Sequence, residues 1–303
     1  MSNGITKPEI LRPLTEPELE ELLQLYKQKY GIDSPQYLLI YNQCKWNEKL
    51  KELKISDQNK KWISFRREFY THAKGDFRTY GTYICLHQDL IQSVTFHTWQ
   101  PDFKELLECL DKTELICWQS GPLLVNVAAE YSKELRQIIA NKGVTIQRAR
   151  SSSLFVLKRE NALNLDPPVI PDGYELRQLQ QEDAELVHSH WPNKKEGSLD
   201  YLKGLIEIDT TFGVFKKADN SLIAWIFRNE FSGLGILQVL ESEQRKGFGT
   251  IVVKAISYAI AKTESINITA WILLENVKSQ TLFRNIGFEA RLVNQWIQLN
   301  KIE

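Results

Sequence analysis

The residues with the clearest chemical potential form one short run of a glutamine, two cations and two glycines: Gln244-Arg245-Lys246-Gly247-Phe248-Gly249-Thr250. An apolar segment with helical spacing follows the run. Backbone amides at the start of a helix lack partners within it, and the helix dipole adds partial positive charge there. Two glycines let a phosphate approach the backbone, and Arg245 and Lys246 add charge at the opening. The run therefore predicts a cradle for a pyrophosphate.

Taken alone, the pattern Gln-x-x-Gly-x-Gly is weak, and three other interpretations compete with it. A Walker loop ends in Gly-Lys-Ser or Gly-Lys-Thr, and Gly249-Thr250 lacks that lysine. A dinucleotide-binding fingerprint needs G-x-G-x-x-G with an acidic residue after the next strand, and this arrangement is absent. A plain structural loop before a helix stays open as the third interpretation.

A second polar segment strengthens the ligand-binding interpretation. Asn276-Val277-Lys278-Ser279 follows a predicted strand at 266–272 and opens a predicted helix, which carries Leu282-Phe283 and ends at Gly287-Phe288. By itself, Asn276 could be a helix cap with Ser279 at the third helical position. Two such segments at the same ends of consecutive strand–helix units rarely arise together by chance.

The elements that position these segments follow one another in a clear order after residue 173. Alternating and apolar runs predict strands at 174–179, 212–216, 222–228, 235–240 and 266–272, with two short strands ending near 296–299. Helical spacing predicts helices at 181–191, 198–208, 248–262 and 276–286. This order predicts an α+β fold, a mixed sheet with helices on both faces.

The first half of the chain mixes strands and helices and contains no catalytic motif. A capping box at 15–18 predicts a helix with Leu19, Leu22, Leu23 and Tyr26 on one face. Strands are predicted at 37–41, 80–86 and 153–157, and helices at 102–110 and 123–139. The proline-rich stretch 161–173 predicts a boundary near residue 165, which gives an N-terminal lobe of 1–165 and a C-terminal domain of 166–303.

Composition narrows the class of protein. The 303 residues include 38 Lys plus Arg and 38 Asp plus Glu, and this neutral balance argues against a nucleic-acid-binding protein. Four cysteines without a CxxC pair predict reduced thiols of an intracellular protein and no metal site. The sequence contains no run of about 18 apolar residues, which a membrane-spanning helix would need. The first residues also lack a signal-peptide pattern, so we expect a cytoplasmic protein.

The two polar segments together resemble the GNAT superfamily of acyl-CoA acyltransferases, over roughly 174–299. Gln244, Gly247 and Gly249 match its pyrophosphate loop, and Asn276, Ser279, Leu282-Phe283 and Gly287-Phe288 match its second coenzyme segment. The resemblance implies that strand 235–240 splays from strand 266–272, with the pantetheine arm of acetyl-CoA or another acyl-CoA between them. The backbone of Val239 and Leu240 would bind one side of the arm. The other coenzyme-binding residues would be 244–250, Asn276, Ser279 and Phe283.

Within the superfamily, the chain is similar to the glycine N-acyltransferase-like group. The clues are its length, a divergent first half, Val187-x-x-x-Trp191, Ala224-Trp225 and Leu240-x-x-x-Gln244. This likeness implies a degenerate GNAT-like N-terminal lobe and transfer of an acetyl or other acyl group to a small amine, such as glycine. It also makes a mitochondrial location an alternative to the cytoplasm. A catalytically inactive coenzyme-binding protein and a protein N-acetyltransferase stay open as other functions.

Two positions depart from the family pattern. Phe283 stands where many members carry a tyrosine that protonates the leaving thiolate, and phenylalanine cannot do so. Gly233 stands near the glutamate that serves as general base in the amino-acid acyltransferases. The nearest carboxylate is Glu230, which we take as the candidate catalytic base, acting through a water. The alternatives are a missing base and a solvated carboxylate in a turn.

Several neighbouring residues have two interpretations each. Glu241 and Glu243 are expected to face outward, because their charge would repel a phosphate. His188 and His190 are two residues apart on a predicted helix, so their side chains diverge and cannot share a metal ion. Trp191 and Trp225 either line an acyl pocket or pack in the core, and Lys278 and Arg284 either reach the 3′-phosphate of the coenzyme or are plain surface charges.

Overall fold

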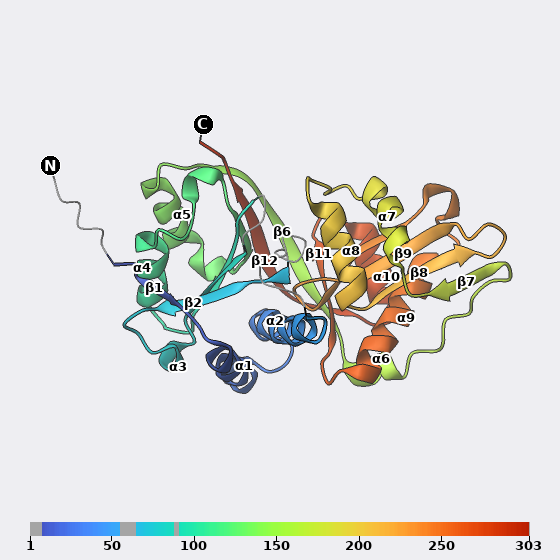
Figure 1. The fold of residues 1–303 in the computed structure, drawn as a ribbon, viewed down its shortest axis with the longest axis horizontal. Helices are drawn as coiled ribbons and strands as arrows, with labels where there is room; N and C mark the ends of the chain where they lie inside the picture. The colour runs from blue at the N-terminus through green and yellow to red at the C-terminus, as the bar shows by residue number, and fades with distance from the viewer. Residues whose placement is uncertain (1–7, 55–64, 88–90, 303) are drawn as a thin grey trace. The chain divides into compact units, whose positions relative to one another are not determined.

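The computed structural model describes residues 8–54, 65–87 and 91–302, and it divides the chain into two compact units that are interleaved in sequence. Unit 1 comprises Met1–Lys29, Arg66–Arg150 and Asn294–Glu303, and unit 2 comprises Tyr30–Phe65 and Ser151–Val293. Figure 1 labels the helices and several strands of both units. In the described ranges, none of the helices has the length and apolar character that crossing a membrane would require.

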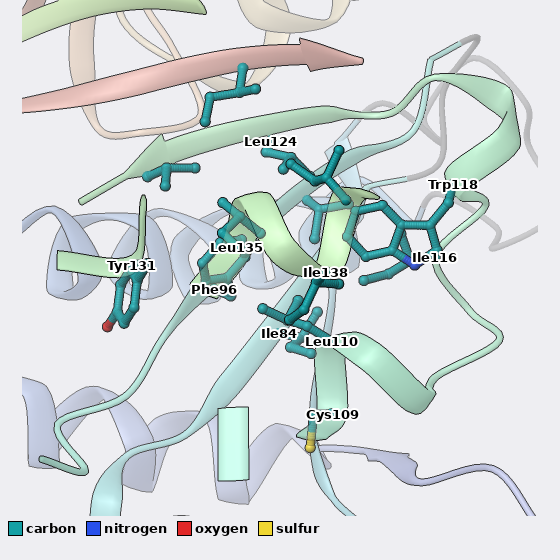
Figure 2. Close-up of a cluster of buried hydrophobic side chains, with 14 of the residues drawn as sticks. Ile84, Phe96, Cys109, Leu110, Ile116, Trp118, Leu124, Tyr131, Leu135 and Ile138 are labelled. Atoms are coloured by element: carbon teal, nitrogen blue, oxygen red, sulfur yellow. The ribbon is translucent and has the colours of Figure 1, made fainter. Parts of the chain in front are cut away.

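Unit 1 is built on a mixed sheet. Its strands, in spatial order, are β1 (Leu11–Pro13), β2 (Glu68–His72), β3 (Tyr83–His87), β4 (Ser93–His97), β5 (Leu123–Val127) and the end of β12 (Glu289–Leu299). Its helices include α1 (Glu16–Tyr30), α3 (Phe77–Tyr80), α4 (Lys104–Lys112) and α5 (Ser132–Asn141). Figure 2 shows its core, where Phe96, Leu124 and Leu135 pack together.

Two predictions for unit 1 are confirmed and one is wrong in part. Helix α1 buries Leu19, Leu22, Leu23 and Tyr26, as its periodicity predicts. Helix α4 lies at the predicted place. The predicted helix at 123–139 is instead strand β5, a short 3₁₀ turn (Ala129–Tyr131) and α5. The apolar run at 123–127 pairs with the sheet on both sides, and a short apolar run does not distinguish strand from helix.

Unit 2 contains the predicted mixed sheet with helices. Its strands, in spatial order, are the end of β6 (Ile146–Leu157), β11 (Ile268–Leu273), β10 (Gly233–Val239), β9 (Leu222–Arg228), β8 (Thr211–Lys216) and β7 (Tyr174–Arg177). Its helices are α2 (Pro35–Glu52), α6 (Arg159–Leu163), α7 (Ala184–His190), α8 (Ser198–Ile208), α9 (Phe248–Thr263) and α10 (Val277–Ile286). Neighbouring strands run antiparallel except β10 and β11, which are parallel.

The strand predicted at 37–41 is wrong, because these residues lie inside α2 of unit 2. Ser34 begins this helix: its hydroxyl accepts a hydrogen bond from the amide of Tyr37 at 3.2 Å, and Pro35 occupies the first turn. The run is apolar at every position because the helix is buried among other elements. Periodicity alone could not separate the two interpretations.

The boundary predicted near residue 165 lies inside unit 2. Six residues of β6, from Ser152 to Leu157, pair antiparallel with β11, so chain that precedes the prolines already belongs to the second sheet. The two short strands predicted at the C-terminus form one continuous strand, β12.

Candidate functional site

Strands β10 and β11 part shortly after β10 begins. Their parallel pairing comprises Gly233 with Thr269 and Leu234 with Ala270. Between Gly235 and Gln238 the register of β10 against β9 shifts, and Ile236 has a φ of 53°. A bulge bends the strand that carries it, so β10 turns away from β11 at this point. The splay implied by the resemblance is therefore present in unit 2.

The backbone at the end of β10 offers one of the two expected contacts. The amide of Leu240 donates to the carbonyl of Ile223 at 2.8 Å, and its carbonyl accepts from the amide of Glu243 at 2.9 Å. Because backbone direction alternates along a strand, the amide of Val239 points away from β9, toward the splay. Leu240 is thus bonded within the protein, and the carbonyl of Val239 accepts from Nε2 of Gln244 at 3.3 Å, so the amide of Val239 is the group placed to bind an arm lying there.

The run after β10 forms an uncapped helix start. Residues 244–247 are exposed, and α9 begins at Phe248 with Gly247 as its N-cap. Among the residues that the structure describes, no side chain caps this end, and the first turn of α9 contains no acidic residue. Gly247 has a φ of 86°, and a Cβ built there meets no atom within 4 Å. The amides of Phe248, Gly249 and Thr250 precede the first helical hydrogen bond, which runs from Ile251 to Gly247.

The two glycines of the run have different tasks. Gly247 supplies a left-handed backbone in open space, which suits the approach of a phosphate. At Gly249 a Cβ would lie 3.0 Å from Cδ1 of Leu282 and 3.7 Å from Cγ2 of Val239, so this glycine lets α9 approach α10 and β10 closely. The ring of Phe248 is buried 4.7 Å from the ring of Tyr174, which leaves its backbone as the part that faces the cradle.

The charges beside the cradle are arranged differently from the sequence prediction. Glu241 is exposed, but the side chain of Glu243 is buried and binds the ammonium groups of Lys216 at 2.7 Å and Lys246 at 2.8 Å. The hydrogen bonds from Lys216 and Lys246 lower the pKa of Glu243 to about 2. Two lysines offset its charge, which explains why an inward Glu243 is tolerated. Arg245, with a φ of 63°, is exposed at the opening.

The segment 276–288 combines a helix cap with a packed aromatic ring. The side-chain oxygen of Asn276 accepts a hydrogen bond from the amide of Ser279 at 3.1 Å, so Asn276 caps α10. Phe283 is buried, with its ring 4.9 Å from that of Phe288. Lys278 and Arg284 are exposed on the same helix. The segment therefore positions α10 beside the splay.

The candidate base has a partner that the sequence analysis missed. Glu230, half-buried after β9, accepts a hydrogen bond from the hydroxyl of Tyr201 at 2.5 Å. Tyr201 comes from α8, and its ring stacks on that of Trp191 with centroids 6.2 Å apart. No sequence signal marks Tyr201, because 29 residues separate it from Glu230. Trp225 is fully buried in the core of unit 2, as its packing interpretation predicts.

His188 and His190 have separate neighbours. Nε2 of His188 lies 3.0 Å from the hydroxyl of Ser198, and the ring of His190 lies 6.0 Å from that of Trp225. Across the part of the chain that the structure describes, no group of three or more His, Cys, Asp or Glu side chains could hold a metal ion.

Comparison with known proteins finds two matching domain families and structures of the same fold. The FR47-like protein family matches residues 211–297, and a domain of unknown function, DUF5645, matches residues 10–138. A tandem GNAT protein from the clavulanic acid biosynthesis pathway matches 96% of this chain over 97% of its own length, with a TM-score of 0.57 at 12% identity. The chain therefore has the fold of GNAT proteins.

Two further solved structures are similar to this chain over nearly its whole length. A GCN5-related N-acetyltransferase from Sphaerobacter thermophilus covers 98% of this chain and 96% of its own, with a TM-score of 0.55 at 12% identity. A Drosophila protein solved by X-ray crystallography is 46% identical, covering 97% of this chain and 99% of its own with a TM-score of 0.94. A search of curated proteins found no match.

Unit 1 repeats the GNAT splay but fills it with its own side chains. Strands β4 and β5 pair in parallel through Ser93 with Leu123 and Val94 with Leu124, the same extent as β10 with β11. Beyond the end of β4, the hydroxyl of Tyr131 bonds both the carbonyl and the amide of Thr98. The backbone groups of Thr98, which would face a pantetheine arm in unit 1, are therefore already hydrogen-bonded to Tyr131.

The helix start of unit 1 is also occupied. At the beginning of α4, the carboxylate of Asp102 accepts from the amide of Lys104 at 3.2 Å, and the side-chain oxygen of Gln100 accepts from the amide of Glu105 at 2.8 Å. Phe103, with a φ of 53°, stands at the N-cap, and its ring packs 4.9 Å from that of Tyr131. Side chains thus bind the first backbone amides of α4. Among the described residues, no side chain caps the corresponding end of α9.

Proposed function

We propose that this protein is an acyl-CoA-dependent N-acyltransferase that acts on a small amine, with its site in unit 2. The observation that carries the proposal is the uncapped, glycine-containing start of α9 at the end of a strand that parts from its neighbour. Acetyl-CoA or another acyl-CoA is the co-substrate. Its diphosphate fits the amides that follow Gly247, and Val239 offers a backbone amide to its arm.

The protein's own residues supply three effects on the reaction. Glu230, directly or through a water, takes a proton from the ammonium form of the acceptor, because only the free amine attacks. Binding of both substrates in one site aligns the nitrogen with the acyl carbon. Backbone amides of β10 stabilise the oxyanion that develops there. The C–N bond forms as the C–S bond breaks, and the thiolate leaves, taking its proton from solvent because Phe283 has none to give.

The acceptor is proposed from chemistry and from the family likeness. The similarity to glycine N-acyltransferases makes an amino acid such as glycine the first candidate. Tyr201 supports a small acceptor, since its hydroxyl holds Glu230 and its ring stacks on Trp191, which leaves a carboxylate bordered by aromatic rings. An ammonium group is attracted both to a carboxylate and to the faces of such rings.

Two positions favour a second candidate, a coenzyme-binding protein that transfers no acyl group. Phe283 packs against Phe288, and Gly233 provides no carboxylate at the start of β10. A chain that had lost both proton-transfer groups would retain the cradle, since the cradle consists of backbone. Binding and turnover must therefore be measured separately.

Thermal unfolding with acetyl-CoA tests binding, and release of free thiol in the presence of an amine panel tests transfer. At a hundredfold excess over Kd, we expect stabilisation by about 2.7 kcal/mol. We expect Glu230→Gln to lower turnover with glycine while the thermal shift remains. The matched control is Glu241→Gln, an exposed carboxylate beside the cradle, which should keep turnover.

The outcomes separate the two candidates. A thermal shift without thiol release for any amine supports the coenzyme-binding protein. The absence of a thermal shift with acetyl-CoA and with longer acyl-CoA donors rejects both. Turnover that is equal in Glu230→Gln and the wild type removes Glu230 from the mechanism.

A further inference from the structure

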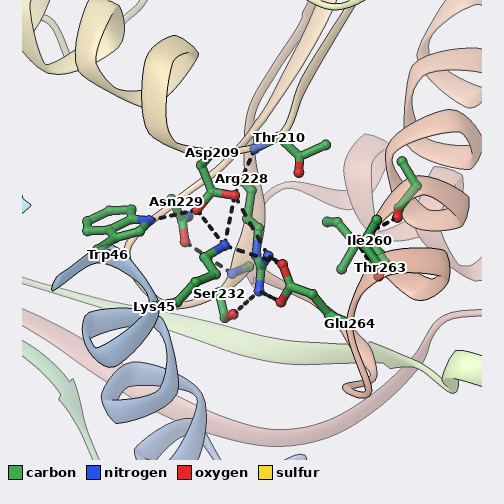
Figure 3. Close-up of polar contacts among 12 residues, drawn as sticks. Lys45, Trp46, Asp209, Thr210, Arg228, Asn229, Ser232, Ile260, Thr263 and Glu264 are labelled. Atoms are coloured by element: carbon green, nitrogen blue, oxygen red, sulfur yellow. Dashed lines mark hydrogen bonds and ion pairs between the residues drawn. The ribbon is translucent and has the colours of Figure 1, made fainter. Parts of the chain in front are cut away.

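A buried arginine lies at the end of β9, close to the point where β10 begins. The side chain of Arg228 is fully buried, and its guanidinium binds both carboxylate oxygens of Glu264, with Nη2 to Oε2 at 2.8 Å (Figure 3). Asp209 adds a second carboxylate, with Oδ1 3.7 Å from Nη1. The two carboxylates that offset the charge of Arg228 are the C-cap residues of two helices, Asp209 of α8 and Glu264 of α9.

The same guanidinium is attached to the turn between β9 and β10. Its second Nη donates to the hydroxyl of Ser232, which has a φ of 57°. The side-chain oxygen of Asn229 accepts from the amides of Phe231 at 3.1 Å and Gly233 at 3.3 Å. This turn, from Asn229 to Gly233, contains Glu230 and begins the strand that splays.

Helix α2 completes the network, although it lies far away in sequence. Lys45 binds Asp209 at 3.0 Å, and the indole nitrogen of Trp46 donates to Asp209 at 2.7 Å. The hydroxyl of Tyr41 donates to Glu264 at 3.0 Å. Three side chains of α2 thus hold the two carboxylates that hold Arg228.

Stability alone does not account for this arrangement. Transfer of an ion pair from water to a protein interior carries a desolvation cost that often cancels the attraction, and well-packed apolar residues can be equally stabilising. Burial opposes ionisation of Glu264, yet the hydrogen bonds and charge of Arg228, with the charge of Lys45, lower its pKa to about 2. A buried network with fixed partners instead favours one geometry for the turn that it contacts.

We propose that the network of Arg228, Asp209 and Glu264, held by α2, is a positioning device for acyl transfer: it fixes the turn that carries Glu230. This inference rests on the proposed function. The network lies at the C-terminal end of α9, and the cradle lies at its N-terminal end. For a helix of 16 residues these ends are about 24 Å apart. Loosening the network therefore disturbs the chemical step and leaves coenzyme affinity unchanged.

Conservative variants of α2 test the proposal with little risk to the fold. Trp46→Phe removes the hydrogen bond to Asp209 and keeps an aromatic ring, and Tyr41→Phe removes the one to Glu264. The matched control is Trp99→Phe in unit 1, which loses an indole hydrogen bond of 3.0 Å to the carbonyl of Thr79. The readouts are kcat with glycine, KM for glycine, Kd for coenzyme A by calorimetry, and hydrogen exchange of the peptide spanning 228–235.

We expect Trp46→Phe to lower kcat about tenfold, because small displacements of a catalytic group weaken its alignment with substrate. Exchange of the 228–235 peptide should rise, the Kd for coenzyme A should stay within about twofold of the wild-type value, and Trp99→Phe should change neither kcat nor exchange. An active wild type whose Trp46→Phe and Tyr41→Phe variants keep kcat and exchange overturns this inference alone. A wild type that transfers no acyl group overturns the proposed function and this inference with it.

Discussion

The phenol oxygen of Tyr131 lies 3.0 Å from the carbonyl oxygen of Thr98 and 3.3 Å from its amide nitrogen, so one side chain satisfies both backbone groups just beyond β4. The corresponding strand end in unit 2 is Val239, whose amide points toward the splay. The splays of the two units thus differ, because Tyr131 bonds the backbone groups at the strand end in unit 1 and the amide of Val239 points toward the splay in unit 2.

From this difference we expect one coenzyme molecule to bind per chain. In unit 1, Tyr131 and the side chains that cap α4 take the positions of a ligand, whereas within the described ranges no side chain caps α9. Calorimetric titration with coenzyme A measures the stoichiometry directly. A stoichiometry near two would mean that coenzyme A displaces Tyr131 and that unit 1 also binds the coenzyme.

Substitution of Gly247 by valine should abolish coenzyme binding and spare the fold. A side chain at this position occupies the open space over the helix start and is strained at a φ of 86°, by roughly 1–2 kcal/mol. Calorimetry should show Kd raised at least about tenfold, as expected when a group worth about 1.4 kcal/mol is lost.

The matched control is Gly143→Val in unit 1. Gly143 has a φ of 73°, and a Cβ there also meets nothing within 4 Å, so it reproduces the backbone strain without a cradle. We expect a similar loss of thermal stability and unchanged Kd. Equal weakening of coenzyme binding in both variants would mean that strain, and not access of phosphate, explains the effect.

Tyr201→Phe should slow transfer without weakening coenzyme binding. The variant keeps the ring that stacks on Trp191 and loses the hydroxyl that donates to Glu230 at 2.5 Å. A hydrogen bond to a charged group contributes about 1.5 kcal/mol, so kcat should fall about tenfold if Glu230 acts in the chemical step. Steady-state kinetics with glycine checks this prediction. An unchanged kcat would mean that the hydrogen bond between Tyr201 and Glu230 has no part in catalysis.

Unit 1 should lose stability as the pH falls below neutrality. Burial lowers the pKa of His97 from 6.5 to about 4, so the folded state disfavours the imidazolium. Between pH 6.5 and 4 the unfolded chain binds more protons than the folded chain, and the stability gained above pH 6.5 is lost as pH falls through this window. The full loss below pH 4 is roughly 3 kcal/mol.

Urea unfolding followed by fluorescence at pH 7 and pH 5 measures this change in the free energy of unfolding. The control is His97→Gln, which cannot titrate and should make the difference between the two pH values smaller. An equal difference in both proteins would assign the pH dependence to other groups.

The sequence alone was sufficient for the features that depend on neighbouring residues. The glycines at 247 and 249, the cap at Asn276 and the periodicity of 248–262 predicted two strand–helix units in the right order, and α9 and α10 lie where they were expected. Spacing within one strand, loop and helix is a local property, because the same few residues determine backbone angles, caps and the exposed face.

Only the tertiary structure decided which distant groups meet. It placed 37–41 in α2 of unit 2, turned Glu243 inward between two lysines, joined Tyr201 to Glu230 and filled the splay of unit 1 with Tyr131. None of these contacts has a signal in spacing, since the partners of a buried charge or an unpaired amide come from whichever elements pack beside it. Local preferences determine the elements, but desolvation of polar groups in the packed chain determines their partners.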